Sequence, residues 1–186
     1  MSYQGPYTAE DALYCFLADS NYGLNAAITA YRTARGLSAT TLPALQQIHR
    51  WWDPGTQITT TTPALMMVWE SMTGETGVNS RMYDHGFGLA LLLVGADVGE
   101  LPGETPEGPV IRACAQYAEI LADLFRRRTP EGQQGWTLAD GTGSLAEGRV
   151  IRATLDSLEL RSMSGDGTFP NQLLLGRVTI RLALDY

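Results

Sequence analysis

Residues 177–184 read RVTIRLAL, a stretch in which apolar and polar side chains alternate. Alternation of this kind predicts a β-strand, because neighbouring side chains of a strand point to opposite faces of its sheet. One face of this strand is apolar and the other carries arginine and threonine, which is typical of a half-buried antiparallel strand at or near a sheet edge. The apolar face is formed by Val178, Ile180, Leu182 and Leu184.

The segment before this strand predicts its hairpin partner. Residues 150–161 also alternate, with a change of phase at Asp156-Ser157 that predicts a β-bulge. Residues 162–170 then supply the loop of a long hairpin.

Two more strands are predicted earlier in the chain. Residues 64–72 are apolar on both faces, which favours a central position, and residues 82–95 form the next strand. Within the latter, Gly86 and Gly88 indicate a bulge or a close approach.

Helical patterns account for most of the rest. A helix is predicted over residues 8–18, which begin at Thr8 with a sequence that resembles a capping box. A second helix is predicted over residues 24–35 and ends before Gly36, a residue typical of helix C-termini. The longest helix covers residues 110–125, which keep an apolar stripe at helical spacing. The order of elements predicts an α+β fold: one antiparallel sheet of about four strands with helices packed on one face.

Three long segments rich in glycine and proline separate these elements. Residues 37–62 form a loop-rich insertion with a short amphipathic stretch around residues 45–52, and residues 99–109 and 131–148 predict further loops. With 186 residues, the chain is interpreted as a single domain over residues 1–186.

The charge balance excludes several classes of function. All thirteen basic residues are arginine, so chemistry that depends on lysine, such as a Walker A phosphate loop or a Schiff base, is excluded. Twenty acidic residues give a net charge of −7, which disfavours tight binding to nucleic acid. We therefore expect no specific binding of nucleic acid.

Compartment and cofactor expectations follow from the remaining composition. The two cysteines, Cys15 and Cys114, lie in helical patterns and are expected to be buried and unpaired. No apolar run is long enough for a membrane span, and no secretory signal is visible at the N-terminus. We expect synthesis in a cytoplasm and no cofactor or metal.

The candidate catalytic and binding motifs favour structural roles. Asp84-His85 lie next to each other on a strand, so their side chains point to opposite faces and cannot easily form an acid–base pair. His49 to Asp53 includes Trp51 and Trp52, which are interpreted as anchors to the core or to another subunit. Gly141 to Gly148 has no lysine and does not match a nucleophile elbow. The chain is therefore not expected to be an enzyme.

The succession of elements resembles the tail terminator, or tail completion, proteins of long-tailed bacteriophages. The resemblance rests on the N-terminal helices, the strand from Pro63 to Met72, the strand from Asp84-His85 to Asp97, the long helix and the terminal hairpin. The insertion at 37–62 departs from the compact family pattern. The resemblance implies a homo-oligomeric, hexameric ring of the virion neck that caps the tail tube, joins the head-side connector and lets double-stranded DNA pass through its lumen.

Two alternatives stay open beside this interpretation. One is another head–tail connector or a tail-tube component, and the other is a small cytoplasmic enzyme or ligand-binding protein. For the ring, an acidic loop that is unlikely to pack on its own core is expected to meet arginines of a neighbouring subunit. The candidate interface residues are Arg177, Arg181, Glu100, Glu104, Glu107, Trp51, Trp52, Arg126, Arg127 and Arg128.

Overall fold

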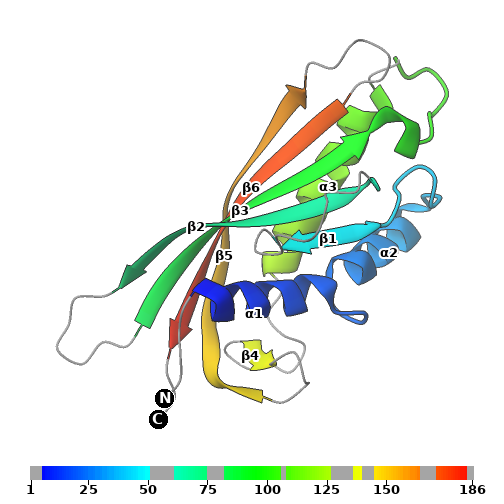
Figure 1. Ribbon diagram of the computed structural model, residues 1–186. Helices are drawn as coiled ribbons and strands as arrows, with labels where there is room; N and C mark the ends of the chain where they lie inside the picture. Colours follow the sequence, from blue (N-terminus) through cyan, green and yellow to red (C-terminus); the bar gives the residue numbers. More distant parts are fainter. Residues whose placement is uncertain are drawn as a thin grey trace.

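The computed structural model describes residues 6–50, 61–74, 82–105, 108–126, 136–139, 145–163 and 171–183. Its elements, in chain order, are α1 (Pro6–Ala18), α2 (Leu24–Arg35), β1 (Gln47–Arg50), β2 (Ala64–Gly74), β3 (Met82–Val94), the 3-10 turn η1 (Gly95–Asp97), α3 (Gly108–Arg126), β4 (Trp136–Ala139), β5 (Leu145–Met163) and β6 (Asn171–Ala183). Figure 1 shows a long twisted sheet with its helices packed against one side. The predicted α+β class is confirmed.

The helices match their predicted residue ranges closely, except at the N-terminal end of α1. The bounds of α2 are as predicted, and Gly36 adopts a left-handed φ of 65° directly after it. The N–H of Leu37 donates to the carbonyl of Arg32 at 2.9 Å, which closes the last turn. The capping box at Thr8 is wrong, because α1 begins at Pro6 and Thr8 lies inside its first turn. Proline is well tolerated at the start of a helix, where its missing N–H has no intrahelical acceptor.

Replacing Gly36 with alanine is expected to lower the free energy of unfolding by about 1 kcal/mol. An added Cβ would meet nothing within 4 Å, so the cost is that of the left-handed backbone alone. Gly36→Asn is the matched control, since asparagine tolerates this conformation and should cost less. Urea denaturation of both variants measures the difference. Equal stability of the two would contradict the assignment.

The four predicted strands form the centre of the sheet, and two short strands extend it. The strand order is β1-β2-β3-β6-β5-β4. The four central strands pair antiparallel, whereas β1 pairs parallel with β2, so the sheet is mixed. Of the two positions expected for the last strand, at a sheet edge or near one, the edge itself is wrong, because β6 lies between β3 and β5, one strand in from the part of β5 that β4 does not cover. Alternation indicates that one face of a strand is covered, but it does not indicate how many strands lie beside it in the sheet.

The core lies between the helices and one face of the sheet. Phe87 of β3, Leu65 of β2 and Val178 of β6 are fully buried on this face. They pack against apolar residues of all three helices, including Leu13, Ile28 and Tyr117. The period-2 alternation of the strands and the helical stripe of α3 thus meet in one cluster, as expected for a two-layer domain.

Local irregularities of the sheet agree with the sequence. The register between β5 and β6 shifts between Leu155 and Ser157, so the bulge predicted at Asp156 is confirmed. A close approach also occurs at Gly88, where it is made by a side chain: an added Cβ would lie 2.7 Å from Oε1 of Glu70. Glu70 itself is the extra residue of a second bulge, between Trp69 and Ser71.

Two segments expected to be loops contain strands. The amphipathic stretch within 37–62 forms β1, and the segment 131–148 contains β4 and the start of β5. Both are short or polar pieces that gain their structure from pairing with a long neighbouring strand. Their own patterns are too brief to predict a strand, since β1 and β4 have four residues each.

Candidate interaction surfaces

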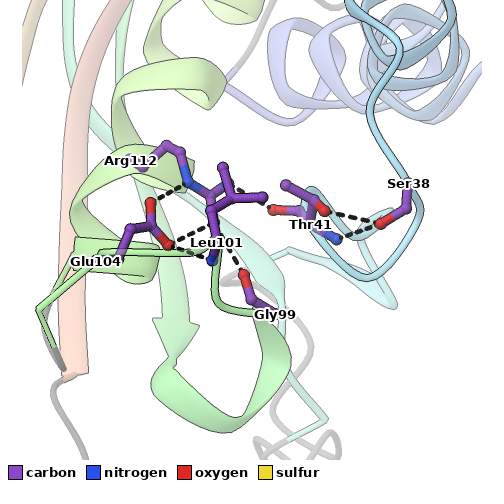
Figure 2. A network of polar contacts seen from close by, with 6 residues as sticks. All are labelled: Ser38, Thr41, Gly99, Leu101, Glu104 and Arg112. Atoms are coloured by element: carbon purple, nitrogen blue, oxygen red, sulfur yellow. Dashed lines mark hydrogen bonds and ion pairs between the residues drawn. The ribbon is translucent and has the colours of Figure 1, made fainter.

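A polar network built around Arg112 joins three segments that are distant in the sequence (Figure 2). Its guanidinium contacts the Glu104 carboxylate, with Nε 2.6 Å from Oε1. It also donates to the carbonyl of Thr41 at 3.0 Å and to that of Gly99 at 2.9 Å. Both charged side chains are 18% exposed. Arg112 therefore fixes the segment after α2 and the segment after η1 to the first turns of α3.

This network changes the interpretation of the acidic segment before α3. Glu104 also accepts a hydrogen bond from the N–H of Leu101, and the hydrogen bond from Arg112 holds the pKa of its carboxyl below the ordinary value. The expectation that this segment does not pack on its own domain is wrong for Glu104. Glu100 is exposed, whereas Glu107 lies outside the described residues. Of the three acidic candidates, Glu100 is the one described with an exposed side chain.

The face of the sheet opposite the helices, here called the bare face, carries an ion pair of its own. Nε of Arg177 on β6 lies 3.2 Å from Oε2 of Glu70 on β2, across Gly88 of the intervening strand. The absence of a side chain at Gly88 leaves the room for this contact. Arg177 is therefore already paired within its own chain. Arg181 is described by its backbone, which lies opposite Asp84 of β3.

The bare face changes character across the sheet. At the β5 side, Thr179 donates to the Asp156 carboxylate at 2.6 Å, and Asp156 is exposed. At the β2 and β3 side, the same face is apolar, although no described helix lies over it. Its half-buried side chains are Met66, Val68, Ala90, Leu92 and Val94. Half-buried apolar side chains on a sheet face without a described helix make this end of the bare face a candidate interaction surface.

The tryptophan and arginine candidates are only partly described. Trp51, Trp52, Arg127 and Arg128 lie outside the described residues, and Arg126 is exposed at the end of α3. None of the described contacts brings Arg126 together with Arg177. The candidates with described side chains, Glu100, Glu104, Arg126 and Arg177, are therefore not joined to one another by any described contact.

Beside the tryptophan pair, Arg50 of β1 has a role that the sequence did not reveal. Its guanidinium lies 2.7 Å from Oδ1 of Asp11 and 3.9 Å from the ring centroid of Tyr14. The two partners are spaced three residues apart on α1, so Arg50 fixes this helix to the sheet edge. The signal was absent from the sequence because the contact joins segments 39 residues apart.

The buried titratable groups of the described residues do not converge on a catalytic arrangement. Asp84 and His85 lie on β3 as predicted, with His85 fully buried and Asp84 half-buried. Neither ring nitrogen of His85 has a hydrogen-bond partner, and burial lowers the pKa of His85 more than the nearby Asp84 carboxylate raises it. Glu10 is 1% exposed, and burial raises the pKa of its carboxyl.

Metal and membrane signals are also absent from the described residues. No three His, Cys, Asp or Glu side chains there converge on a position that could hold a metal ion. No described helix combines the length and apolarity needed to cross a bilayer.

A groove on the helical layer is a further feature that sequence reasoning missed. It has a volume of about 380 Å³ and lies between α2 and α3. Tyr31 donates a hydrogen bond to Glu119 at 2.5 Å, and Arg35 lies 3.5 Å from the same carboxylate. The small side chains that leave this space are Ala27, Ala30 and Ala34 of α2.

Comparisons with known proteins do not place the chain in a family. No family model matches its sequence, and no curated protein matches it. One solved structure, of a protein that carries a serial designation instead of a functional name, covers 99% of this chain and 98% of its own. The sequence identity is 10% and the TM-score is 0.37, which is too low to support an argument about fold or function.

Proposed function

We propose that this protein is a structural component of a bacteriophage neck, a ring of the tail terminator kind that caps the tail tube and joins it to the head-side connector. The observation that carries the proposal is the bare face, where apolar side chains of β2 and β3 have no described helix over them. A chain that leaves such a face open has a surface for another macromolecule. The order of helices and strands supports the same class of protein.

The charge of the chain suits a ring through which DNA moves. With thirteen arginines against twenty acidic residues, contacts with phosphate are unfavourable on average. Arg177 and Arg112 are each already paired with a carboxylate of their own chain, which reduces their attraction for phosphate. DNA is therefore a passing neighbour in this proposal and not a ligand.

The experiment compares the two ends of the bare face. Leu92→Asp is expected to abolish capping of tail tubes, because it places a charge on the apolar end, whereas Thr154→Asp at the polar end is the matched control. Circular dichroism establishes that both variants fold. Electron microscopy of tubes grown from the cognate tail tube protein then measures their length. Uniform tube length with Leu92→Asp, or uncontrolled length with the unmodified chain, would contradict the proposal.

A further inference from the structure

Among the described residues, two strands have an outer edge that is only partly paired, one on each side of the sheet. β1 pairs with β2 from Ala64 to Met67, and no described strand lies along the outer side of β2 after Met67. On the other side, β4 pairs with β5 between Leu145 and Val150, and no described strand lies along the outer side of β5 after Val150. Long open edges are templates for pairing with another strand, and natural proteins usually cover or interrupt them.

The directions of the strands make these two edges complementary to each other. β2, β3, β6 and β5 pair antiparallel in succession, so β5 runs opposite to β2. Rotation about an axis that makes an acute angle with the strands keeps the sense, up or down, in which each strand runs along that axis. A second copy rotated in this way therefore brings its β5 antiparallel to β2 of the first copy. One copy offers both halves of a head-to-tail interface, and such interfaces generate rings when the rotation closes.

The exposed apolar side chains indicate the register of this pairing. Met72 of β2 is 47% exposed and Leu160 of β5 is 42% exposed, and both are among the few large apolar side chains left open to solvent. Both lie on the helix-facing side of the sheet, since Met72 is opposite His85 and Leu160 is opposite Leu174. Directly opposed antiparallel residues share a face, so pairing Met72 with Leu160 of the next copy buries each against the other.

The two short outer strands leave room for this arrangement. In the Met72–Leu160 register, Met163 at the end of β5 falls just past Met67, where β1 stops. β4 pairs with β5 at the other end, beyond the shared stretch. Figure 1 shows the end of β2 extending past the helices, so none of the described helices obstructs the approach of a neighbouring strand there.

The register also determines whether the assembly closes. Across the paired strands, Met72 is aligned with Ile180 of β6, and Leu160 is aligned with Leu174 of the same strand. Ile180 and Leu174 are six positions apart, so the proposed contact has a stagger of six positions. Six positions correspond to roughly 20 Å along a strand, and four strands per copy have a width of roughly 19 Å. Copies remain level around the axis if the strands tilt by about 45°, close to the tilt of closed barrels. The stagger is therefore compatible with a ring.

We propose that β2 of each copy pairs antiparallel with β5 of the next copy, with Met72 opposite Leu160, so that one continuous sheet closes the ring. The occupant of each edge is a second copy of this chain. The proposal rests on the ring proposed above and specifies how its subunits join.

Cysteine cross-linking of the full chain tests this register. In a single copy, three strand spacings and a stagger of six positions separate Met72 from Leu160 by roughly 24 Å. This is beyond the reach of a disulfide, whose Cα atoms are at most about 7 Å apart. Met72→Cys combined with Leu160→Cys is therefore expected to form disulfides only between copies. Burial raises the pKa of the native Cys114 to about 11 and also raises that of Cys15, so their thiols stay protonated and slow to oxidise at pH 8.

The matched control moves one cysteine to the opposite face. Met72→Cys with Glu159→Cys is expected to give roughly fivefold less cross-linked product, because neighbouring strand residues point to opposite faces. Mild oxidation followed by denaturing electrophoresis should give a ladder for the first variant that ends at a single ring size. Native mass spectrometry of the unmodified chain gives that ring size independently.

The outcomes separate this proposal from the proposed function. Rings in the unmodified chain without a ladder, or with equal products in both variants, would overturn the strand pairing and leave the ring intact. Product that stops at a dimer would overturn the head-to-tail arrangement, and a ladder without an end would overturn closure. Absence of rings from the unmodified chain, free and on tail tubes, would overturn both.

Discussion

Replacing Arg112 with methionine is expected to lower the free energy of unfolding by about 3 kcal/mol. The substitution removes two hydrogen bonds from the guanidinium to carbonyl oxygens, and each such bond contributes at least about 1.5 kcal/mol. These bonds join the carbonyls of Thr41 and Gly99, which belong to segments with few other polar contacts to α3. The substitution also leaves the Glu104 carboxylate without its cation. Chemical denaturation measures the loss, and methionine keeps most of the apolar stem so that packing changes little.

Arg35 offers the matched control on the neighbouring helix. It also forms an ion pair with a glutamate, at 3.5 Å from Glu119, but the two side chains are 61% and 59% exposed. Exposed pairs of this kind contribute about 0.5 kcal/mol, so Arg35→Met should be close to neutral. Adding Glu104→Gln to Arg112→Met should restore part of the lost stability, because an unpaired carboxylate is removed. Equal destabilisation by the two arginine substitutions would show that the network is not a structural fixing point.

The network also carries a pH dependence of known sign. Hydrogen bonding to Arg112 lowers the pKa of Glu104 in the folded chain below the ordinary value of 4.5. A depressed folded pKa means that the pair stabilises fully above that value and that its contribution is lost as the pH falls below it. This part of the acid sensitivity should be absent from Glu104→Gln.

The sequence predicted those parts of the fold in which a local pattern coincides with burial. Alternation in 177–184 and the apolar stripe of the long helix both follow from facing one core, and both elements were found. Prediction from the sequence failed where the structure of a segment depends on a partner in another segment. β1 forms because β2 lies beside it, and Glu104 is held by a cation eight residues further along the chain. Pairing of this kind leaves no periodic trace in the chain.

The candidate surfaces show the same division. Charge alone indicated that Arg177 and Glu104 could meet partners outside the chain, but side-chain charge does not reveal a partner within reach in the fold. The partner of Arg177 is Glu70, brought close by a bulge and by a glycine between them. The partly paired edges of β2 and β5 could not be predicted either, because an edge is a property of strand order, and the last strand was expected at or near an edge.

Replacing His85 with leucine is expected to raise the free energy of unfolding by at least about 1 kcal/mol at pH 8, where the histidine is neutral in both states. His85 is fully buried between β2 and β6, opposite Met72 and Ile180, and neither ring nitrogen has a hydrogen-bond partner. Burying a polar group in this way carries an unrecovered desolvation cost. Leucine has a similar size and removes that cost.

The pH dependence of the same substitution identifies the cause. Burial lowers the pKa of His85 in the folded chain below its ordinary value of 6.5, so below pH 6.5 the unfolded chain binds a proton that the folded chain does not. Stability therefore falls as the pH decreases through 6.5, by up to about 1.4 kcal/mol per pH unit, until the folded pKa is reached. Glu10 acts in the opposite direction, because its raised pKa costs stability as the pH rises above 4.5. Comparing each variant with the unmodified chain at every pH cancels the Glu10 contribution.

Two variants then separate burial cost from titration. His85→Leu and His85→Gln should both lose the decline below pH 6.5, since neither side chain titrates. Only the leucine variant should also gain stability at pH 8, because glutamine keeps polar atoms in the same buried position. Urea denaturation between pH 5 and pH 8 supplies both measurements. A decline below pH 6.5 that persists in both variants would assign the acid sensitivity to another group, and a loss of stability in His85→Leu at pH 8 would mean that the buried imidazole has a partner that stabilises it.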